Sequence, residues 1–130
     1  MPAMAANFDR IAEMALRLPE AERVDIEAWG GEPTFRVRGK NFVFANPDGS
    51  IITVKLGKNE AEAVVATVED AEPTGYGLGR HGWISVQLPK RLSRERWEEI
   101  EEWVLTSYTL VAPKSMAHRV LADVEAEDGS

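Results

Sequence analysis

The sequence predicts an α+β domain of two layers, an antiparallel sheet with helices on one face. Apolar residues follow a helical period near both ends of the 130-residue chain, and they alternate with polar residues in several segments between. The predicted order is a helix, three or four strands, a helix, one or two strands and a helix. This order lacks the regular alternation of strands and helices that is typical of a parallel sheet, so neighbouring strands are expected to run antiparallel.

The first helix is predicted between Asn7, as its N-cap, and Pro19. Apolar residues recur every three or four positions in this segment, and proline cannot continue a helix. A short strand follows over residues 24–28. The sequence Trp29-Gly30-Gly31 then predicts a turn or a bulge.

A meander of strands is predicted next. Residues 34–38 alternate, Gly39-Lys40 forms a turn, and residues 42–45 return along the first strand. The sequence Asn46-Pro47-Asp48-Gly49 is typical of a tight turn, because proline fixes one backbone angle and glycine tolerates a positive φ. Residues 51–56 are therefore predicted to form the next antiparallel strand.

The second helix is predicted from a capping box, in which Asn59 is followed three residues later by Glu62, and it ends near Glu69. Residues 73–82 are rich in glycine and are predicted to be irregular. Residues 83–88 alternate again and are predicted to form a further strand.

The last long helix is predicted to begin after Ser93, as its N-cap, and to end or bend at Pro113. Its glutamates lie mostly opposite its apolar stripe, and we interpret them as a solvated face. A single domain over residues 7–114 is expected, with an N-terminal tail over residues 1–6. Residues 115–130 are expected to form a C-terminal extension that starts with a turn or helix and has a mobile polar end.

Composition restricts the functions open to this chain. It has no cysteine and two histidines, which excludes thiolate metal sites, thiol nucleophiles and histidine-rich metal centres. We expect no enzyme activity, no cofactor and no metal. The net charge of −7 opposes a general attraction to nucleic acid, so such binding needs a local basic patch. No apolar run is long enough for a membrane span and no signal-peptide pattern is recognisable, so a cytoplasmic location is expected.

The segment Gly77–Gly82 spells G-x-G-x-x-G, a pattern that in dinucleotide-binding folds lets the backbone approach a phosphate. Here it precedes a strand instead of following one, so a plain turn is the favoured interpretation, and an anion nest beside Arg80 is the second. His81 and Ser85 lie too far apart along a strand to act as base and nucleophile, and His81 is expected in an exposed loop. His118 is interpreted as a cation at a helix end.

Cations are concentrated in two segments. Residues 34–58 contain five cations and one acid, and residues 76–94 contain four cations and no acid. Alternation along the strand predicts that Arg36 and Arg38 share the outer face of the sheet. A nucleic-acid contact site would combine such cations with a ring on which a base stacks. The predicted contact residues are Arg36, Arg38, Lys40, Arg80, His81 and Trp83, with Tyr76 as an alternative ring.

The competing interpretation of the same pattern is structural. Surface cations that balance the acidic segments would give the same charge distribution, and Trp83 would then belong to the core.

Five segments occur in a recognisable order: Leu18-Pro19, Phe35–Phe42, Val54–Leu56, Gly75–Trp83 and Ser107–Lys114. Together they resemble the MmcQ/YjbR-like family of small bacterial proteins, over about residues 8–114, which is nearly the whole domain. The resemblance implies an α+β fold similar to that of secretion chaperones, in the order helix, three strands, helix, two strands, helix. Members are often labelled DNA-binding, and the family has no agreed catalytic residues.

One departure from the family pattern affects the predicted site. Many members have a histidine directly before the tryptophan, whereas this chain has Gly82 there and His81 one position earlier.

The leading hypothesis is a non-enzymatic domain with weak binding of DNA or other nucleic acid through the predicted contact residues. The alternative is a protein-interaction or chaperone-like module, including a homodimer. A third class, an enzyme or small-ligand carrier, requires a pocket near Tyr76 and His81 with a carboxylate such as Glu32 beside the imidazole.

Overall fold

The computed structural model describes residues 3–26, 32–75 and 77–128, and it confirms the α+β prediction. Its sheet has six antiparallel strands in the order β1-β2-β3-β4-β6-β5. The elements in chain order are α1 (Ala3–Leu16), β1 (Ala21–Ile26), β2 (Glu32–Val37), β3 (Lys40–Ala45), β4 (Ile51–Lys55), α2 (Lys58–Thr67), β5 (Ala71–Pro73), the short 3-10 helix η2 (Leu78–His81), β6 (Trp83–Gln87), α3 (Arg94–Val111) and α4 (Lys114–Asp128).

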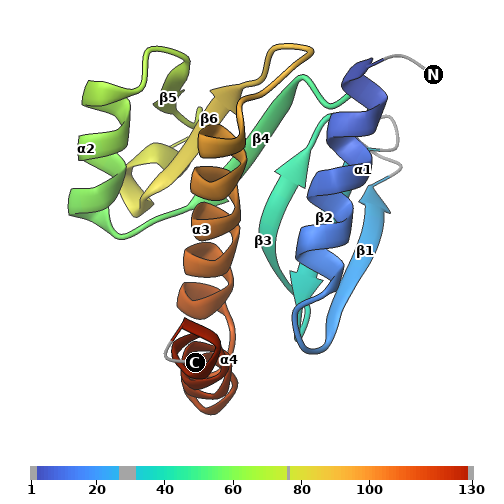
Figure 1. The fold of residues 1–130 in the computed structure, drawn as a ribbon. Coiled ribbons are helices and arrows are strands. Elements are labelled where there is room, and N and C mark those ends of the chain that lie inside the picture. The colour runs from blue at the N-terminus through green and yellow to red at the C-terminus, as the bar shows by residue number, and fades with distance from the viewer. Residues whose placement is uncertain (1–2, 27–31, 76, 129–130) are drawn as a thin grey trace.

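Helices α1 and α3 cover one face of the sheet, and α2 lies beside β5 and β6 (Figure 1). The core lies between these layers. Ile11 of α1, Phe35 and Val54 of the sheet, and Ile100 and Tyr108 of α3 are all fully buried there. Burial of apolar side chains of this size stabilises a fold by about 1.5–3 kcal/mol each, so the two-layer packing dominates the stability.

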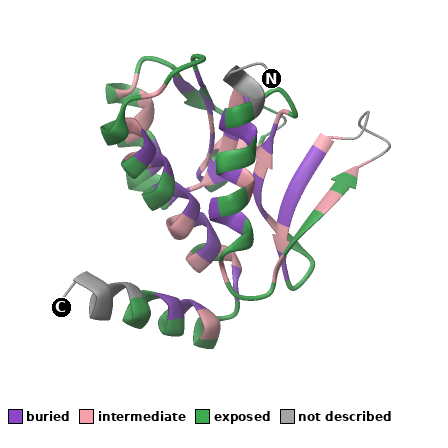
Figure 2. Cartoon of the chain, turned by 45° about the vertical axis from the view of Figure 1, so that its right-hand side comes forward, coloured by how far each residue is buried: buried purple, intermediate pink, exposed green. Residues whose placement is uncertain are grey.

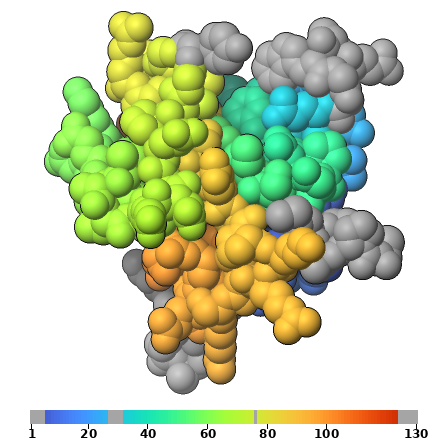
Figure 3. Space-filling view, turned by 90° about the horizontal axis from the view of Figure 1, so that it is seen from above, coloured from blue at the N-terminus to red at the C-terminus, as the bar shows by residue number. Residues whose placement is uncertain are grey.

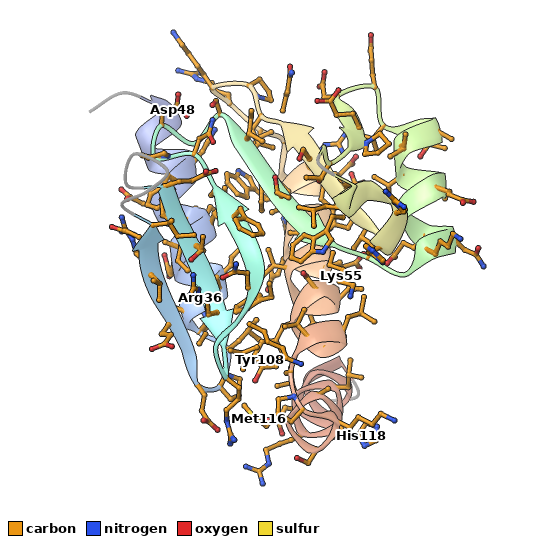
Figure 4. All side chains as sticks on the ribbon, turned by 180° about the vertical axis from the view of Figure 1, so that it is seen from behind. Arg36, Asp48, Lys55, Tyr108, Met116 and His118 are labelled. Carbon is orange, nitrogen blue, oxygen red and sulfur yellow. The ribbon has the colours of Figure 1, made fainter. Side chains whose placement is uncertain are left out.

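The opposite side of the sheet is not covered by any described helix, as the view from behind shows (Figure 4), and we call it the helix-free face. The strand register places Arg36, Phe44, Thr53 and Ser85 on this face, because they alternate with the buried core residues. Hydroxyl groups connect its centre: Ser85 Oγ lies 2.9 Å from Thr53 Oγ1 and 3.0 Å from the hydroxyl of Thr74.

Strands β3 and β4 pair over three residues and then diverge (Figure 1). Where the ladder would continue, the fully buried Ser107 of α3 is inserted between the strands. Its hydroxyl accepts a hydrogen bond from the Lys55 amide (2.9 Å) and donates one to the Phe42 carbonyl (2.5 Å). Ser107 thus replaces the missing ladder bond, and α3 holds the two halves of the sheet together.

The turn between β2 and β3 corrects one prediction about the arginines. Val37 pairs directly with Lys40, so the two-residue loop is Arg38-Gly39, and both have positive φ (52° and 81°). This geometry is that of a type I′ turn, whose twist suits a hairpin. Arg38 therefore leaves the strand and does not share the outer face with Arg36.

Helix boundaries depart from the predicted caps where tertiary contacts intervene. Asn7 is not an N-cap, because α1 begins at Ala3, and the buried Asn7 side chain instead donates a hydrogen bond to the Pro89 carbonyl (2.9 Å). Asn59 is not a cap either, since Gly57 occupies the N-cap of α2 without a side-chain bond. The Ser93 prediction is confirmed: its hydroxyl accepts from the Arg96 amide at 3.0 Å.

The glycine-rich segment is more regular than predicted. It contains η2 and the last residue of β5, and the glycines at both ends of η2 have left-handed φ angles, 78° at Gly77 and 90° at Gly82. The C-terminal extension is also more regular, because α4 continues to Asp128 and extends away from the sheet (Figure 2). The predicted turn at residues 29–31 and the ring of Tyr76 lie outside the described residues.

No helix in the described part of the chain is both long enough and apolar enough to span a membrane.

Candidate nucleic-acid interface

The six predicted contact residues fall into two groups. Arg36, Arg38 and Lys40 lie on β2, its turn and the start of β3, whereas Arg80, His81 and Trp83 lie on η2 and at the start of β6. Strands β3 and β4 stand between β2 and β6, so at about 4.8 Å per strand Arg36 on β2 and Trp83 on β6 are separated by roughly 14 Å, and Lys40 on β3 is one strand closer. Figure 3 shows the same separation, with the yellow-green segment near residues 60–80 apart from the blue-to-cyan segment near residues 20–40.

In the first group, Arg38 is already paired. Its guanidinium donates two hydrogen bonds to the Glu20 carboxylate, from Nε at 2.8 Å and from Nη2 at 3.0 Å. The pKa of Glu20 is lowered mainly by this hydrogen bond and also by the charge of Arg38, and both effects raise the pKa of Arg38. Arg38 is therefore the least available of the predicted cations.

Arg36 and Lys40 make no ion pair within the described residues. Arg36 is half-buried and stands opposite Glu22 in the register, so its charge is partly balanced across the strands. Lys40 is exposed and lines a surface hollow with Arg38 and Lys114 at the C-terminal end of α3. Helix C-termini carry partial negative charge, so these cations have a structural explanation.

The second group is joined by two cations that the prediction did not include. Lys55 is the direct cross-strand partner of Trp83, so the two side chains lie side by side on the helix-free face. Lys58, the first residue of α2, lines one hollow together with Arg80 and Trp83. We call Lys55, Lys58, Arg80 and Trp83 the Trp83 cluster. Within the described part of the chain none of its cations forms an ion pair.

Local structure explains why these residues meet. The Asp48 carboxylate accepts hydrogen bonds from the Ser50 amide (2.9 Å) and hydroxyl (2.6 Å), which fixes the turn into β4 and lowers the pKa of Asp48. At the other end of β4, the Leu56 amide donates to the Gly82 carbonyl at 2.9 Å. A Cβ at Gly82 would stand 2.1 Å from the Leu56 carbonyl oxygen, so only glycine allows this approach.

The close approach at Gly82 brings η2 and the start of β6 against the end of β4. It also bears on the family histidine, because a side chain at position 82 does not fit this backbone. His81 is exposed and lies on η2, whereas Glu32 lies on β2, so the structure does not bring together the imidazole and carboxylate of the third hypothesis. The described residues contain no group of three or more acidic, histidine or cysteine side chains positioned to hold a metal.

Trp83 differs from the other two described tryptophans. Trp97 and Trp103 are buried in α3, each beneath an arginine guanidinium. Trp83 is half-buried and contacts the Phe44 ring edge to face, with centroids 5.4 Å apart. Part of its indole therefore faces solvent beside three cations. Figure 4 shows Lys55 on β4 and Arg36 across the divergence of β3 and β4.

A comparison with protein families matches residues 16–110 to the YjbR family model, which is most of the chain. The chain belongs to the YjbR family. This confirms the resemblance predicted from the order of its sequence segments. No curated protein matches the chain significantly.

A solved structure supports the same fold. The crystal structure of Deinococcus radiodurans protein DR2400, described as a DUF419 domain, superposes with a TM-score of 0.60 at 20% sequence identity. The match covers 80% of this chain and 77% of DR2400. At this identity the similarity establishes the fold and transfers no functional residue.

The contact residues predicted from the sequence include Arg80 and Trp83 of this cluster and do not include Lys55 and Lys58. Both lysines lie in the cation-rich segment 34–58, so their charge was visible. Their position beside Trp83 depends on the pairing of β4 with β6, which skips over α2 and β5. Such a non-local pairing has no local signal in the sequence.

Proposed function

We propose that this YjbR domain binds single-stranded nucleic acid weakly, through the Trp83 cluster. The observation that supports the proposal is the placement of three unpaired cations around one half-buried indole in a chain of net charge −7. Phosphates are attracted to lysine and arginine, and an unpaired base stacks on an aromatic ring, gaining about 1–3 kcal/mol per base. A duplex hides its base faces, so a single strand fits the indole better.

The test is fluorescence anisotropy with a labelled single strand of about 15 nucleotides, a length within the range of small single-strand sites. Neutralising three phosphates predicts a slope of log K against log salt of about −2. Affinity should then fall roughly tenfold to twentyfold between about 50 and 200 mM salt. The double variant Lys55→Ala with Arg80→Ala should flatten the slope by about 1.4.

A charge-matched control is Arg17→Ala with Arg94→Ala. Both arginines are exposed and ion-paired; Arg17 directly follows α1 and Arg94 is the first residue of α3, away from the Trp83 cluster. The control removes the same number of charges and should leave the slope unchanged. An equal loss in both double variants, or no binding by the wild type at about 50 mM salt, would contradict the proposal.

A homodimer is the second candidate, supported by a different surface. The large exposed apolar side chains among the described residues are Leu16, Leu110 and Leu121. Leu16 is the last residue of α1, Leu110 lies near the end of α3, and Leu121 lies on α4, which packs against α3. A hollow beside Leu16 and Leu121 is lined mainly by apolar residues together with Arg17, Glu101 and Asp123, so the cation of one copy can pair with an acid of a second copy.

This candidate predicts a molar mass that rises with protein concentration in light scattering. Leu121→Asp should hold the mass at that of a monomer, and Leu110→Ala is the milder comparison. A wild-type mass that stays monomeric at every concentration would exclude the dimer.

A further inference from the structure

The hollow beside Trp83 has two distinct walls. One is a single stripe of α2, formed by residues three or four positions apart, namely Lys58, Ala61, Glu62, Val65 and Ala66. The other wall comes from β5, η2 and β6, and includes Pro73, Gly79 and Trp83. The hollow encloses about 280 Å³, near the lower end of the roughly 300–1,000 Å³ usual for small-molecule sites. It therefore has room for a single small ligand and not for a larger one.

Charged and apolar side chains occupy different parts of this hollow. Lys58 and Arg80 supply positive charge, whereas Ala61, Val65 and Ile84 supply apolar surface. Arg80 folds back over η2, since a Cβ on Gly77 would stand 3.2 Å from its Nη2 atom. Glu62 is the one acidic residue of the lining and lies one helical turn beyond Lys58, about 6 Å along the axis.

A nucleotide has the same order of groups. Its phosphate is separated by the sugar from a flat base, and the edge of the base carries hydrogen-bond donors or acceptors. A carboxylate only accepts hydrogen bonds, so it favours a base edge with an amino group, as in cytosine. Thymine presents carbonyl oxygens on both sides of its one N–H, and these repel a carboxylate.

We propose that the hollow holds one unpaired nucleotide and that Glu62 selects its base. The phosphate lies at Lys58 and Arg80, the base lies against Trp83 and Val65, and Glu62 accepts a hydrogen bond from the exocyclic amino group. This inference rests on the proposed single-strand binding and adds a preference to it: cytosine is bound more tightly than thymine.

A purely electrostatic role for Glu62 makes a different prediction. Glu62 lies four residues after Lys58, a spacing at which ion pairs form on helices, yet no ion pair joins them in the described structure. If Glu62 only reduced the positive charge of the hollow, its removal would strengthen binding to every sequence equally. The ratio of affinities for two sequences separates the two roles.

The experiment compares oligo-dC with oligo-dT, each about 15 nucleotides long, by anisotropy with the full chain. Wild type should bind oligo-dC about fivefold more tightly, which is the lower end of the discrimination that a bidentate contact to a base edge provides. Glu62→Gln should bring the ratio close to one, mainly by strengthening binding to oligo-dT. Glu60→Gln, an exposed acid on the same helix that does not line the hollow, should keep the fivefold ratio.

The outcomes distinguish a failure of base selection by Glu62 from a failure of single-strand binding. Equal wild-type affinities for the two strands, with both weakened by Lys55→Ala and Arg80→Ala, would overturn the role of Glu62 and leave single-strand binding intact. A ratio that Glu62→Gln does not change would also overturn it. No binding to either strand would overturn both proposals.

Discussion

Replacing Ser107 by alanine tests how the two halves of the sheet are joined. The hydroxyl satisfies two backbone groups at once, the Lys55 amide and the Phe42 carbonyl, at a fully buried position. Leaving a buried polar group unpaired costs about 1–3 kcal/mol, and two groups are affected. Because β3 and β4 can close slightly and recover part of one bond, we expect Ser107→Ala to lower the free energy of unfolding by about 2–4 kcal/mol.

Urea unfolding followed by far-UV circular dichroism measures this loss. With a slope of about 2 kcal/mol per molar urea, the midpoint should fall by roughly 1–2 M. Thr67→Ala is the matched control, since its exposed hydroxyl bonds only to the Ala63 carbonyl of the same helix (2.7 Å) and should change stability by less than about 0.5 kcal/mol. A loss below about 1 kcal/mol in Ser107→Ala, with an unchanged slope, would refute the bridging role.

Two further predictions concern stability. Gly82→Ala should lower the free energy of unfolding by about 3 kcal/mol or more, because it combines a positive φ with a clash at the Leu56 carbonyl. Gly39→Ala, which has open space around its Cβ, should lower it by about 1 kcal/mol. Equal urea midpoints for the two variants would contradict this. Tyr108 donates a hydrogen bond to the Pro19 carbonyl at 2.8 Å, and burial raises the pKa of its hydroxyl. Because the pKa is raised in the folded state, the stabilisation is present below the ordinary value near 10 and is lost as pH rises through the folded value. Wild type should therefore be more stable than Tyr108→Phe by about 1 kcal/mol at neutral pH, and this difference should shrink in urea titrations at alkaline pH. A difference that stays constant or grows would argue against it.

Features governed by neighbouring residues were predictable. The Ser93 hydroxyl caps α3 by accepting a hydrogen bond from the Arg96 amide in the first turn of that helix. The Asn46–Gly49 sequence forms the turn into β4, where the Asp48 carboxylate accepts a hydrogen bond from the Ser50 hydroxyl. Asn7 has the same local preference for a cap as Ser93, yet its side chain is taken by Pro89, which lies 82 residues away. Local propensity fails where a distant group competes for the same side chain.

The candidate site illustrates the same limit. Arg38 was expected on the sheet face because strands alternate, but the hairpin places it in the turn, beside Glu20. Lys55 and Lys58 had no distinguishing local signal in the sequence, and they lie beside Trp83 only because β4 pairs with β6 and α2 packs next to β6. Charge patterns therefore indicated which segments are basic, and topology decided which of their side chains meet.

The insertion of Ser107 also constrains the order in which the chain assembles. The serine lies 52 residues after the amide that it binds and 65 residues after the carbonyl. During synthesis from the N-terminus, β3 and β4 both emerge from the ribosome before α3 is made. The ends of the two strands therefore lack the bridge that Ser107 provides until α3 has formed. Until α3 docks, the unpaired ends of β3 and β4 are exposed, and the chain is more prone to aggregate during this time.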